Sequence, residues 1–514
     1  MKLGKSTSNS RTKDKYHGAY IGVLDLGTTS VRFIIFQLNG MVVSESYLPV
    51  KQYYPRSGWV EEDPTEIWEA SQEVIKRSFL QSQINSKEIV AIGICNQRES
   101  TVVWDKNSGE PYSNLIVWQD RRTSERCDEL KNQGLIDIVK GKTGLIIDPY
   151  FSATKLEWIL NNNKEIKDKA KRGEVFFGTL DTWIIFKLTG EHLTDVSNAS
   201  RTMLFNICSL NWDEELLSIF DVPKSILPKV LPSYGSSMFG LTKKDSVFNN
   251  EIPICSDFGD QQASLFGQKC FQEGDIKGTF GTGAFMMVNT GRNKVVSKNN
   301  LLTTIFYGSD KNEIFYALEG SIYNTGSIFQ WLKEELRVIN DYGDIERLGS
   351  EVNYQNSMFL VPAFTGLGAP FWDPYARGII VGLTRASSRK HIVRAAVEAI
   401  AYRTKDVLIA MQSDSGIMFS EMKIDGGVSQ NKLFCQILAD LTGIKIKRFD
   451  IKEITALGAM YGAGIGAGFW GSPFQIRGDR SFDEYSPEID DEFREDLYRN
   501  WSRAVLRSRE WINK

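Results

Sequence analysis

Apolar residues in this chain gather in short uninterrupted runs near the start of each half, where they are separated by glycine-containing turns. Residues 20–24 and 31–37 are β-rich runs that flank a Gly-Thr-Thr-Ser turn. Asn39-Gly40 then turns the chain into a third run at residues 41–45. This pattern predicts an antiparallel meander at the start of the chain.

A helical pattern and a fully apolar run follow the meander. Asp63 before Pro64 predicts the start of a helix that extends through residue 76, because aspartate caps helix N-termini and proline suits the first turn. Residues 89–95 form a continuous apolar run, which is typical of a strand buried on both faces. Helices and strands then alternate through residue 266, which indicates an α/β fold.

The second half opens in the same way as the first. Residues 276–280 and 284–288 flank Gly281-Thr282-Gly283, so a glycine-threonine hairpin begins each half. This repeat predicts two related α/β domains, which we expect at residues 19–270 and 271–514.

Two later segments complete the pattern. Residues 422–425 lead to Gly426-Gly427 and then to a helix predicted from about Asn431 to Leu441. Residues 454–476 carry no charge, and glycine recurs at every fourth position from 458 to 466. We interpret this segment as a tightly packed buried helix rather than a membrane span, because glycine and alanine fill most of it.

Composition indicates a globular protein with more than one core. The 514 residues exceed what one core organises, and a net charge of −3 gives no basic field for nucleic acid or an acidic membrane surface. The six cysteines include no CxxC pair, which indicates reduced thiols in a cytoplasmic protein. The three histidines exclude an HExxH zinc site and argue against a Ser/His/Asp triad.

Residues 1–18 are rich in lysine, serine and threonine, so they predict a disordered tail.

Polar residues that directly follow two predicted buried strands are the first candidates for chemistry. Arg98 and Glu99 follow the first of these strands, and Asp260 and Gln261 follow a strand predicted at residues 253–256. Ligands of α/β sheets collect at the carboxyl ends of strands, and a polyol needs such donors and acceptors. We interpret Asp260 as a general base, a role for which a carboxylate of ordinary pKa suffices, with metal ligation as its rival role. A surface ion pair is the alternative for Arg98 and Glu99.

The two glycine-threonine turns are candidates for phosphate binding. Successive backbone N–H groups and hydroxyls in such turns bind phosphate oxygens, and Asp25 is a candidate to hold Mg²⁺ through water. Thr282 is the counterpart in the second turn. Neither turn is a Walker A loop or a GxGxxG fingerprint, and an ordinary hairpin turn is the alternative. The candidates around the first turn are Thr28, Thr29, Ser30 and Arg32.

Aromatic residues and a second glycine pair complete the candidate site. Trp118 and Tyr150 lie in polar or turn-rich stretches and are candidates to wall a small pocket, with ordinary core aromatics as an equal alternative. Gly427 lets a planar base approach the backbone, and Asn431 is a candidate partner for the base or ribose. A plain strand–helix turn is the alternative there.

In these residues and motifs the chain resembles the FGGY carbohydrate kinase family, from about residue 20 to residue 511. The matching stretches include DLGTTSVR (25–32), NQRES (96–100), IVWQDRR (116–122), GDQQASLFGQ (259–268), FGTGAFMMVNTG (280–291) and DGGVSQN (425–431). The family has an actin/hexokinase/Hsp70-like fold. The resemblance therefore implies an α/β fold of two ribonuclease H-like (actin-like ATPase) domains that face each other across a catalytic cleft.

The resemblance also implies an activity and a set of site residues. The activity is transfer of the γ-phosphoryl group of ATP to glycerol, with Mg²⁺, to give sn-glycerol 3-phosphate and ADP. The implied glycerol-binding residues are Arg98, Glu99, Trp118, Tyr150, Asp260, Gln261 and Phe285, with Asp260 as the catalytic base. The implied nucleotide-binding residues are Thr28, Thr29, Ser30, Arg32, Thr282, Gly326, Gln330, Gly427 and Asn431, of which Gly326 and Gln330 rest on the resemblance alone. Asp25, through water, and Asp260 are the candidate Mg²⁺ ligands.

The expected partners are glycerol and ATP or ADP, with no nucleic acid and no integral membrane segment. A homodimer or a homotetramer stays open. One rival function is a kinase for a longer sugar such as xylulose or gluconate. The adjacent Arg98-Glu99 pair and the bulky Trp118 argue against it and favour a three-carbon substrate. The other rival is a catalytically silent paralogue that binds or scaffolds, against which the intact Asp260 and glycine-threonine turns argue.

Overall fold

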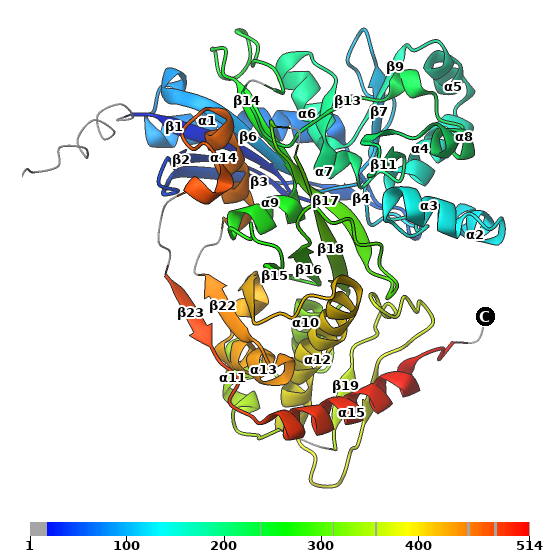
Figure 1. Cartoon of the computed structure of the whole chain (residues 1–514), viewed down its shortest axis with the longest axis vertical. Helices are drawn as coiled ribbons and strands as arrows, with labels where there is room; N and C mark the ends of the chain where they lie inside the picture. Colours follow the sequence, from blue (N-terminus) through cyan, green and yellow to red (C-terminus); the bar gives the residue numbers. More distant parts are fainter. Residues whose placement is uncertain are drawn as a thin grey trace, which may run out of the picture.

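Two mixed β-sheets, each built around one glycine-threonine hairpin, organise the chain (Figure 1). The computed structural model describes residues 18–512 except 237, 312, 355–356, 450–452 and 477–480. The predicted disordered tail therefore lies, apart from Gly18, outside the described residues.

The first sheet contains the predicted meander. In spatial order its strands are β14 (Ile254–Gly259), β6 (Ile89–Asn96), β1 (Tyr20–Leu26), β2 (Ser30–Gln37) and β3 (Val42–Pro49). The strands β1, β2 and β3 pair antiparallel, whereas β6 runs parallel to both β1 and β14. The predicted meander and the predicted buried strand are both confirmed. Because β6 and β14 are parallel neighbours, their carboxyl ends meet at one edge of the sheet.

The second sheet repeats this arrangement. In spatial order its strands are β17 (Leu302–Gly308), β18 (Ile314–Ile322), β16 (Ala284–Asn289), β15 (Ile276–Phe280), β21 (Glu421–Asp425), β22 (Lys445–Phe449) and β23 (Phe482–Tyr485). Five of them, β15, β16, β18, β21 and β22, pair with the same order and directions as β1, β2, β3, β6 and β14. The repeat inferred from one hairpin in each half therefore extends over five strands, and the predicted fold of two related α/β units is confirmed.

Helices and short strand pairs surround the two sheets. The helices are α1 (Pro64–Ser82), α2 (Ser124–Asn132), α3 (Ile136–Thr143), α4 (Ser152–Asn162), α5 (Lys164–Lys171), α6 (Leu180–Thr189), α7 (Val196–Ala199), α8 (Glu214–Ile219), α9 (Asp260–Gly267), α10 (Gly326–Glu334), α11 (Gly343–Gly349), α12 (Arg389–Ser415), α13 (Lys432–Thr442), α14 (Ile454–Gly466) and α15 (Asp491–Ser508). The short pairs and triplets are formed by β4 (Gln52–Tyr53), β5 (Glu61–Glu62), β7 (Val102–Asp105), β8 (Leu115–Ile116), β9 (Val175–Gly178), β10 (Leu193–Asp195), β11 (Phe205–Asn206), β12 (Asn211–Trp212), β13 (Lys229–Leu231), β19 (Phe359–Val361) and β20 (Ile379–Val381).

Helix α1 begins as predicted but is longer. The Asp63 side chain accepts hydrogen bonds from backbone N–H groups of the first turn, and Pro64 opens the helix. The helix extends more than one turn beyond its predicted end, to Ser82. Phe79 in this added segment packs 6.0 Å, between ring centroids, from Phe33 of β2. Tertiary packing therefore extends the helix beyond the point where its apolar pattern ends.

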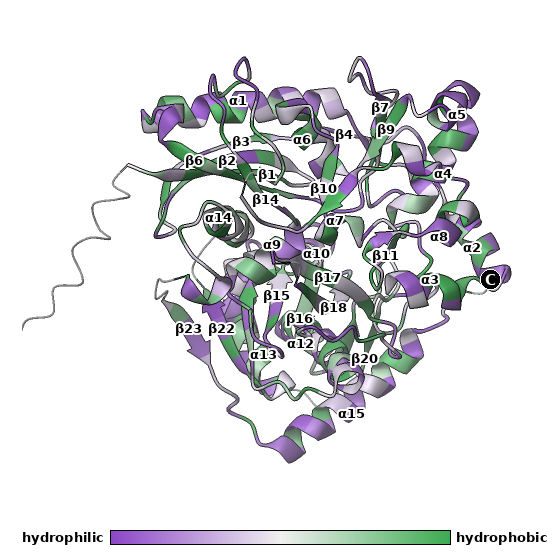
Figure 2. Ribbon diagram, turned by 45° about the horizontal axis from the view of Figure 1, so that its top comes forward, coloured by the Kyte–Doolittle hydropathy of each residue, from purple (hydrophilic) through white to green (hydrophobic). Residues whose placement is uncertain are grey.

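The outer helices are amphipathic. Figure 2 shows alternating hydrophilic and hydrophobic segments along α1 and α15, whereas the strands inside both sheets are mostly hydrophobic. In α15 the buried residues Leu497, Trp501 and Val505 follow each other at intervals of four, and all three belong to the core beneath the second sheet. This spacing places one apolar stripe of the helix against the core and leaves the other side to solvent.

Helix α14 joins the second half of the chain to the first sheet. It packs against α9, β6 and β14, and Figure 1 shows it, in orange, beside the first sheet although β22 and β23 lie with the second sheet. A Cβ atom on Gly458 would lie 1.8 Å from the carbonyl oxygen of Ala263, and one on Gly462 would lie 2.6 Å from the ring of Phe258. Glycine at these positions is what permits the close packing. The predicted buried helix is therefore confirmed, although it ends at Gly466 rather than at residue 476.

The position of α14 bears on two other expectations. Within the described residues no helix is long and apolar enough to cross a membrane. A domain division near residue 271 stays a prediction, because α14 follows it in sequence and yet packs on the first sheet.

Replacing Gly458 by alanine tests this close contact. The added methyl group meets backbone atoms of α9, which have no freedom to rotate away, so the free energy of unfolding should fall by about 1–3 kcal/mol or more. The matched control is Gly141→Ala in α3, where a Cβ has no neighbour within 4 Å and φ is not positive. Thermal unfolding followed by circular dichroism measures both variants. Equal midpoints for the two variants would contradict the role of Gly458.

Candidate active site

Arg98 and Glu99 lie buried just beyond the carboxyl end of β6. Only 3% of Arg98 and 1% of Glu99 is exposed, so the alternative of a surface ion pair is wrong. Glu99 adopts φ 64°, a left-handed conformation that is uncommon outside glycine. Its carbonyl oxygen accepts hydrogen bonds from the hydroxyls of Ser152 (2.8 Å) and Thr101 (3.0 Å). These contacts hold the turn that carries both side chains.

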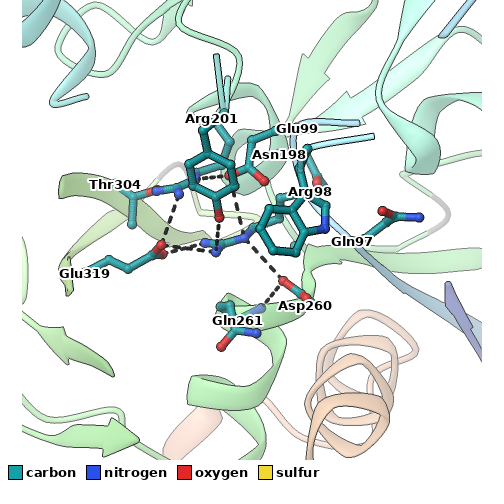
Figure 3. A network of polar contacts seen from close by, with 12 residues as sticks. Gln97, Arg98, Glu99, Asn198, Arg201, Asp260, Gln261, Thr304 and Glu319 are labelled. Carbon is teal, nitrogen blue, oxygen red and sulfur yellow. Dashed lines mark hydrogen bonds and ion pairs between the residues drawn. The ribbon is translucent and has the colours of Figure 1, made fainter. Parts of the chain in front are cut away.

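A buried network of ion pairs connects these two residues to the second sheet. Glu319 on β18 accepts hydrogen bonds from Arg98 Nη1 (2.6 Å) and Nη2 (3.1 Å). Arg201, which follows α7, donates through Nη2 to Glu319 (3.0 Å) and through Nε to Glu99 (2.6 Å). Figure 3 shows the two guanidinium groups between the two carboxylates. The network thus joins both halves of the chain in the interior.

The two carboxylates of this network have different electrostatic surroundings. Burial by itself raises the pKa of Glu319, but Arg201 and Arg98 outweigh it and lower this pKa to about 2. For Glu99 burial is the stronger influence, and its pKa lies above the usual value although Arg201 and Arg98 oppose the shift. Glu319 is therefore the firmly ionised partner of the two arginines.

Asp260 and Gln261 lie at the start of α9, beside Arg98. The preceding strand β14 extends to Gly259 rather than to the predicted residue 256. Asp260 Oδ1 lies 3.2 Å from Arg98 Nε and accepts a 2.7 Å hydrogen bond from the backbone N–H of Gln261. Its side chain keeps 31% of its surface exposed, in contrast to the 2% of Arg98.

The pKa of Asp260 lies above the ordinary aspartate value. Burial raises the pKa of this carboxyl, and the opposing influences of Arg98 and Lys277 are weaker. Asp260 is therefore more basic than an ordinary aspartate, although an ordinary pKa was expected to suffice for a base at this position.

The predicted aromatic residues come together beside Arg98. The ring centroid of Trp118 lies 5.4 Å from that of Tyr150 and 6.4 Å from that of Phe285. Arg98 Nη2 lies 3.4 Å from the Tyr150 hydroxyl. All three rings are partly exposed, which disfavours the alternative of ordinary core aromatics. Phe285 comes from β16 of the second sheet, so this aromatic group also spans both halves of the chain.

The first glycine-threonine turn lies next to this aromatic group. Thr28 Oγ1 accepts a 3.0 Å hydrogen bond from Trp118 Nε1, which connects the turn to the aromatic residues. Arg32 forms ion pairs with Asp25 and with Glu453. Thr29 and Ser30 belong to the same turn and are not fully buried. Asp25 is only 4% exposed, and its carboxylate is paired with Arg32.

The second turn lies against the start of α10. The backbone N–H of Gly326 donates to the Gly281 carbonyl oxygen (2.9 Å), and that of Thr325 donates to Thr282 (3.0 Å). A Cβ on Gly326 would lie 2.6 Å from the same Gly281 oxygen, so only glycine fits there. Gln330 is exposed one turn further along α10, where it donates to Glu334. The structure thus brings together Thr282, Gly326 and Gln330, which lie up to 48 residues apart in sequence.

The glycine pair after β21 has two distinct roles. Gly426 adopts φ 95°, and a Cβ there would lie 2.4 Å from the Phe280 carbonyl oxygen. Gly427 has no atom within 4 Å of a Cβ position, so its surface is open as predicted. Asn431 caps α13 through a 2.9 Å hydrogen bond from the backbone N–H of Phe434. This cap occupies the Oδ1 atom of Asn431 and supports the alternative that the residue has a structural role in a plain strand–helix turn.

Three buried charged residues of the site were absent from the sequence prediction: Arg201, Lys277 and Glu319. All three residues are fully buried, with 0% of their surface exposed. The available signal was a charged residue within an otherwise apolar strand, as for Glu319 in IFYALEGSI and Lys277 in IKGTF. Such a residue must find a partner inside the fold. No group of three or more His, Cys, Asp or Glu side chains suited to a metal ion occurs in the described part of the chain.

A repeated α/β unit with polar residues at the carboxyl ends of parallel strands is the architecture of actin-like ATPases. The chain belongs to the FGGY family of carbohydrate kinases. The N-terminal domain of this family matches residues 20–267, and its C-terminal domain matches residues 276–467. The resemblance recognised in the sequence is thereby confirmed.

Individual relatives are similar over nearly the whole chain. The glycerol kinase of Caldanaerobacter subterraneus subsp. tengcongensis is 52% identical over 498 residues, which cover 96% of this chain and 99% of the relative. Glycerol kinase 2 of Thermotoga maritima is 50% identical over 495 residues, with the same coverage. The crystal structure of Plasmodium falciparum glycerol kinase with ADP is 35% identical and matches with a TM-score of 0.90 over 96% of this chain and 99% of that one. A xylulose kinase from Lactobacillus acidophilus, at 23% identity and a TM-score of 0.85, shares the fold.

Replacing Glu319 by glutamine tests the buried network. The amide leaves two buried guanidinium groups without their shared carboxylate, so the free energy of unfolding should fall by about 3–5 kcal/mol. The control is Glu313→Gln just before β18, which removes an ion pair with Arg292 in which the two side chains are 38% and 67% exposed. That change should cost less than about 1 kcal/mol. Urea unfolding measures both variants, and equal losses would show that Glu319 stabilises no more than a surface pair does.

Proposed function

We propose that this chain is a glycerol kinase that transfers the γ-phosphoryl group of ATP to glycerol and releases sn-glycerol 3-phosphate and ADP. The main observation behind this proposal is that Arg98, Glu99, Tyr150 and the partly exposed Asp260 lie together near the carboxyl ends of two parallel strands. The high identity to glycerol kinases over nearly the full chain supports the same substrate. A small set of charged donors and acceptors beside aromatic rings suits a short polyol.

In this proposal Asp260 is the general base. A glycerol hydroxyl donates its proton to the carboxylate while its oxygen forms the new bond to the γ-phosphorus and the bond to the β-phosphate oxygen breaks. The raised pKa of Asp260 makes it a stronger base than an ordinary aspartate. Arg98, fixed by Glu319, and Glu99, fixed by Arg201, supply a rigid donor and a rigid acceptor for the other hydroxyls.

We assign the nucleotide to the two turns and the glycine pair. Backbone N–H groups and hydroxyls of the turns suit phosphate oxygens, and the open Gly427 suits a planar base. The nucleotide-binding residues in this proposal are Thr28, Thr29, Ser30, Arg32, Thr282, Gly326, Gln330, Gly427 and Asn431. Mg²⁺ commonly binds one or two carboxylates together with phosphates and water, so Asp25, through water, and Asp260 fit its donor requirements. The ion would neutralise charge on the phosphates.

The setting of the reaction is proposed as well. We place the chain in the cytoplasm, since all six cysteines are free thiols, and we place the reaction in a cleft between domains at residues 19–270 and 271–514. Closure of such a cleft would exclude water and limit hydrolysis of ATP. Homodimer and homotetramer remain the two candidate assemblies.

The direct test is release of ADP by the purified protein with ATP and Mg²⁺, measured in a coupled assay. Glycerol should stimulate release strongly, and xylulose and gluconate should not. The variant Asp260→Asn should lower kcat by at least about 10²-fold, because the amide does not accept the hydroxyl proton. The control Asp128→Asn changes an aspartate with a 71% exposed side chain and should leave kcat unchanged.

Circular dichroism of Asp260→Asn establishes that the fold survives. Stimulation by xylulose or gluconate instead of glycerol would favour the longer-sugar rival. The absence of release with every substrate would favour a scaffold protein. Near-normal turnover by Asp260→Asn would refute the assignment of the base.

The raised pKa of Asp260 also predicts how activity depends on pH. The base acts only when ionised, so kcat/KM for glycerol should fall as the pH is lowered through the pKa of Asp260. Since that pKa lies above the ordinary aspartate value of about 3.9, the fall should begin at a correspondingly higher pH. Initial rates across the acidic range, with circular dichroism at each pH as the control for unfolding, measure this limb. A constant rate down to the onset of acid unfolding contradicts it.

A further inference from the structure

Lys277 is a fully buried lysine that faces the candidate glycerol-binding residues from the second sheet. It lies on β15 with 0% of its surface exposed. Its Nζ atom donates hydrogen bonds to Gln261 Oε1 (2.5 Å) on α9 and to Thr279 Oγ1 (2.9 Å) on its own strand. A buried ammonium group costs considerable free energy unless it is well paired, so this contact needs an explanation beyond simple packing.

The contact determines which way the amide of Gln261 points. An ammonium group carries donors only, and a side-chain amide presents an acceptor oxygen on one side and two N–H donors on the other. Because Lys277 occupies the oxygen, the nitrogen Nε2 of Gln261 must take the opposite position. Gln261 is partly exposed and neighbours Asp260, whose Oδ1 already accepts the backbone N–H of Gln261. Base and amide are thus fixed side by side, the first as an acceptor and the second as a donor.

Lys277 itself is held in place by polar and charged neighbours. Thr279 Oγ1 lies 3.4 Å from Ser264 Oγ, which donates to the Asp425 carboxylate at 3.2 Å. Burial lowers the pKa of Lys277 to about 8, and the nearby carboxylates of Asp425 and Asp260 oppose this decrease. The amine therefore keeps its proton at neutral pH and acts as a donor there.

We propose that Lys277 is a positioning residue that locks the Gln261 amide with its N–H groups toward the substrate, so that Gln261 binds a glycerol hydroxyl as a hydrogen-bond donor. The inference rests on the proposed glycerol kinase activity and adds to it a specificity-determining contact. Without the ammonium group the amide is free to rotate, and half of its orientations present an oxygen where the substrate requires a donor. The effect should appear in glycerol binding rather than in ATP binding.

A double-mutant cycle with steady-state kinetics tests the proposal. Lys277→Met keeps a side chain of similar length but removes the donors, and it should raise the KM for glycerol about tenfold while the KM for ATP changes less than about twofold. Lys277→Arg, which is also donor-only, should retain more glycerol affinity than Lys277→Met. Gln261→Met should raise the KM for glycerol by itself, and the double variant should be no worse than Gln261→Met alone, because Lys277 acts through Gln261.

The control for charge loss is Lys445→Met on β22, whose side chain is 53% exposed and pairs with Glu484. It should change neither KM. Thermal midpoints verify that each variant is folded, and Lys277→Gln, which keeps an N–H donor but adds an acceptor, replaces Lys277→Met in the cycle if the latter does not fold. With this replacement a smaller but still non-additive increase is expected.

Four results would overturn the inference. An unchanged KM for glycerol and an unchanged kcat in Lys277→Met would show that the amide needs no lock. Additive effects in the cycle would show that Lys277 does not act through Gln261, and a lower kcat with an unchanged KM would show that the ammonium group acts on Asp260 instead. These three results are obtained with an active wild type and leave the proposed function intact. If the wild-type protein does not phosphorylate glycerol, the proposed function is wrong and the inference falls with it.

Discussion

The carboxylate of Glu319, shared by Arg98 and Arg201, is the interaction on which the candidate site depends. It belongs to the second sheet, whereas both arginines follow elements of the first part of the chain. Taking these charges out of water is costly, and only good geometry with several hydrogen bonds compensates for it. The arrangement largely meets that condition: Glu319 accepts three hydrogen bonds from the two guanidinium groups, and Arg201 Nη1 is buried without a hydrogen-bond partner. The same contacts that hold the halves together therefore also fix Arg98 and, through Arg201, Glu99.

The repeated topology explains why these residues meet at all. In each unit a hairpin is followed by parallel strands, so the hairpin turn and the carboxyl ends of the next strands lie at the same edge of the sheet. Glycine at the contact points lets the remaining elements come close: Gly458 brings α14 onto α9, and Gly426 brings the β21 turn onto Phe280. The geometry of the candidate site therefore comes from a local turn structure that occurs once in each of the two repeated units.

The sequence predicted well those features that depend on local chain chemistry. The meander, the Asp63 cap, the glycine-lined helix at residue 454 onward and the residues after the two buried strands all follow from spacing and residue type. The sequence did not predict the charge partners, because Arg98 and Glu319 are separated by 221 positions and a buried ion pair leaves no local pattern. The pKa of Asp260 was missed for the same reason, since it depends on burial by segments distant in sequence.

The contacts between the two sheets also affect Asp260, the proposed base. Arg98 contacts Glu319 through its Nη atoms and approaches Asp260 through Nε at 3.2 Å, so one guanidinium group serves carboxylates from both halves of the chain. Its positive charge lowers the pKa of Asp260 against the stronger effect of burial. A rotation of one sheet relative to the other would lengthen one of these contacts and change how strongly Asp260 is stabilised as an anion. The basicity of Asp260 therefore depends on the relative position of the two halves, and in the proposed reaction this dependence connects proton transfer to closure of the cleft.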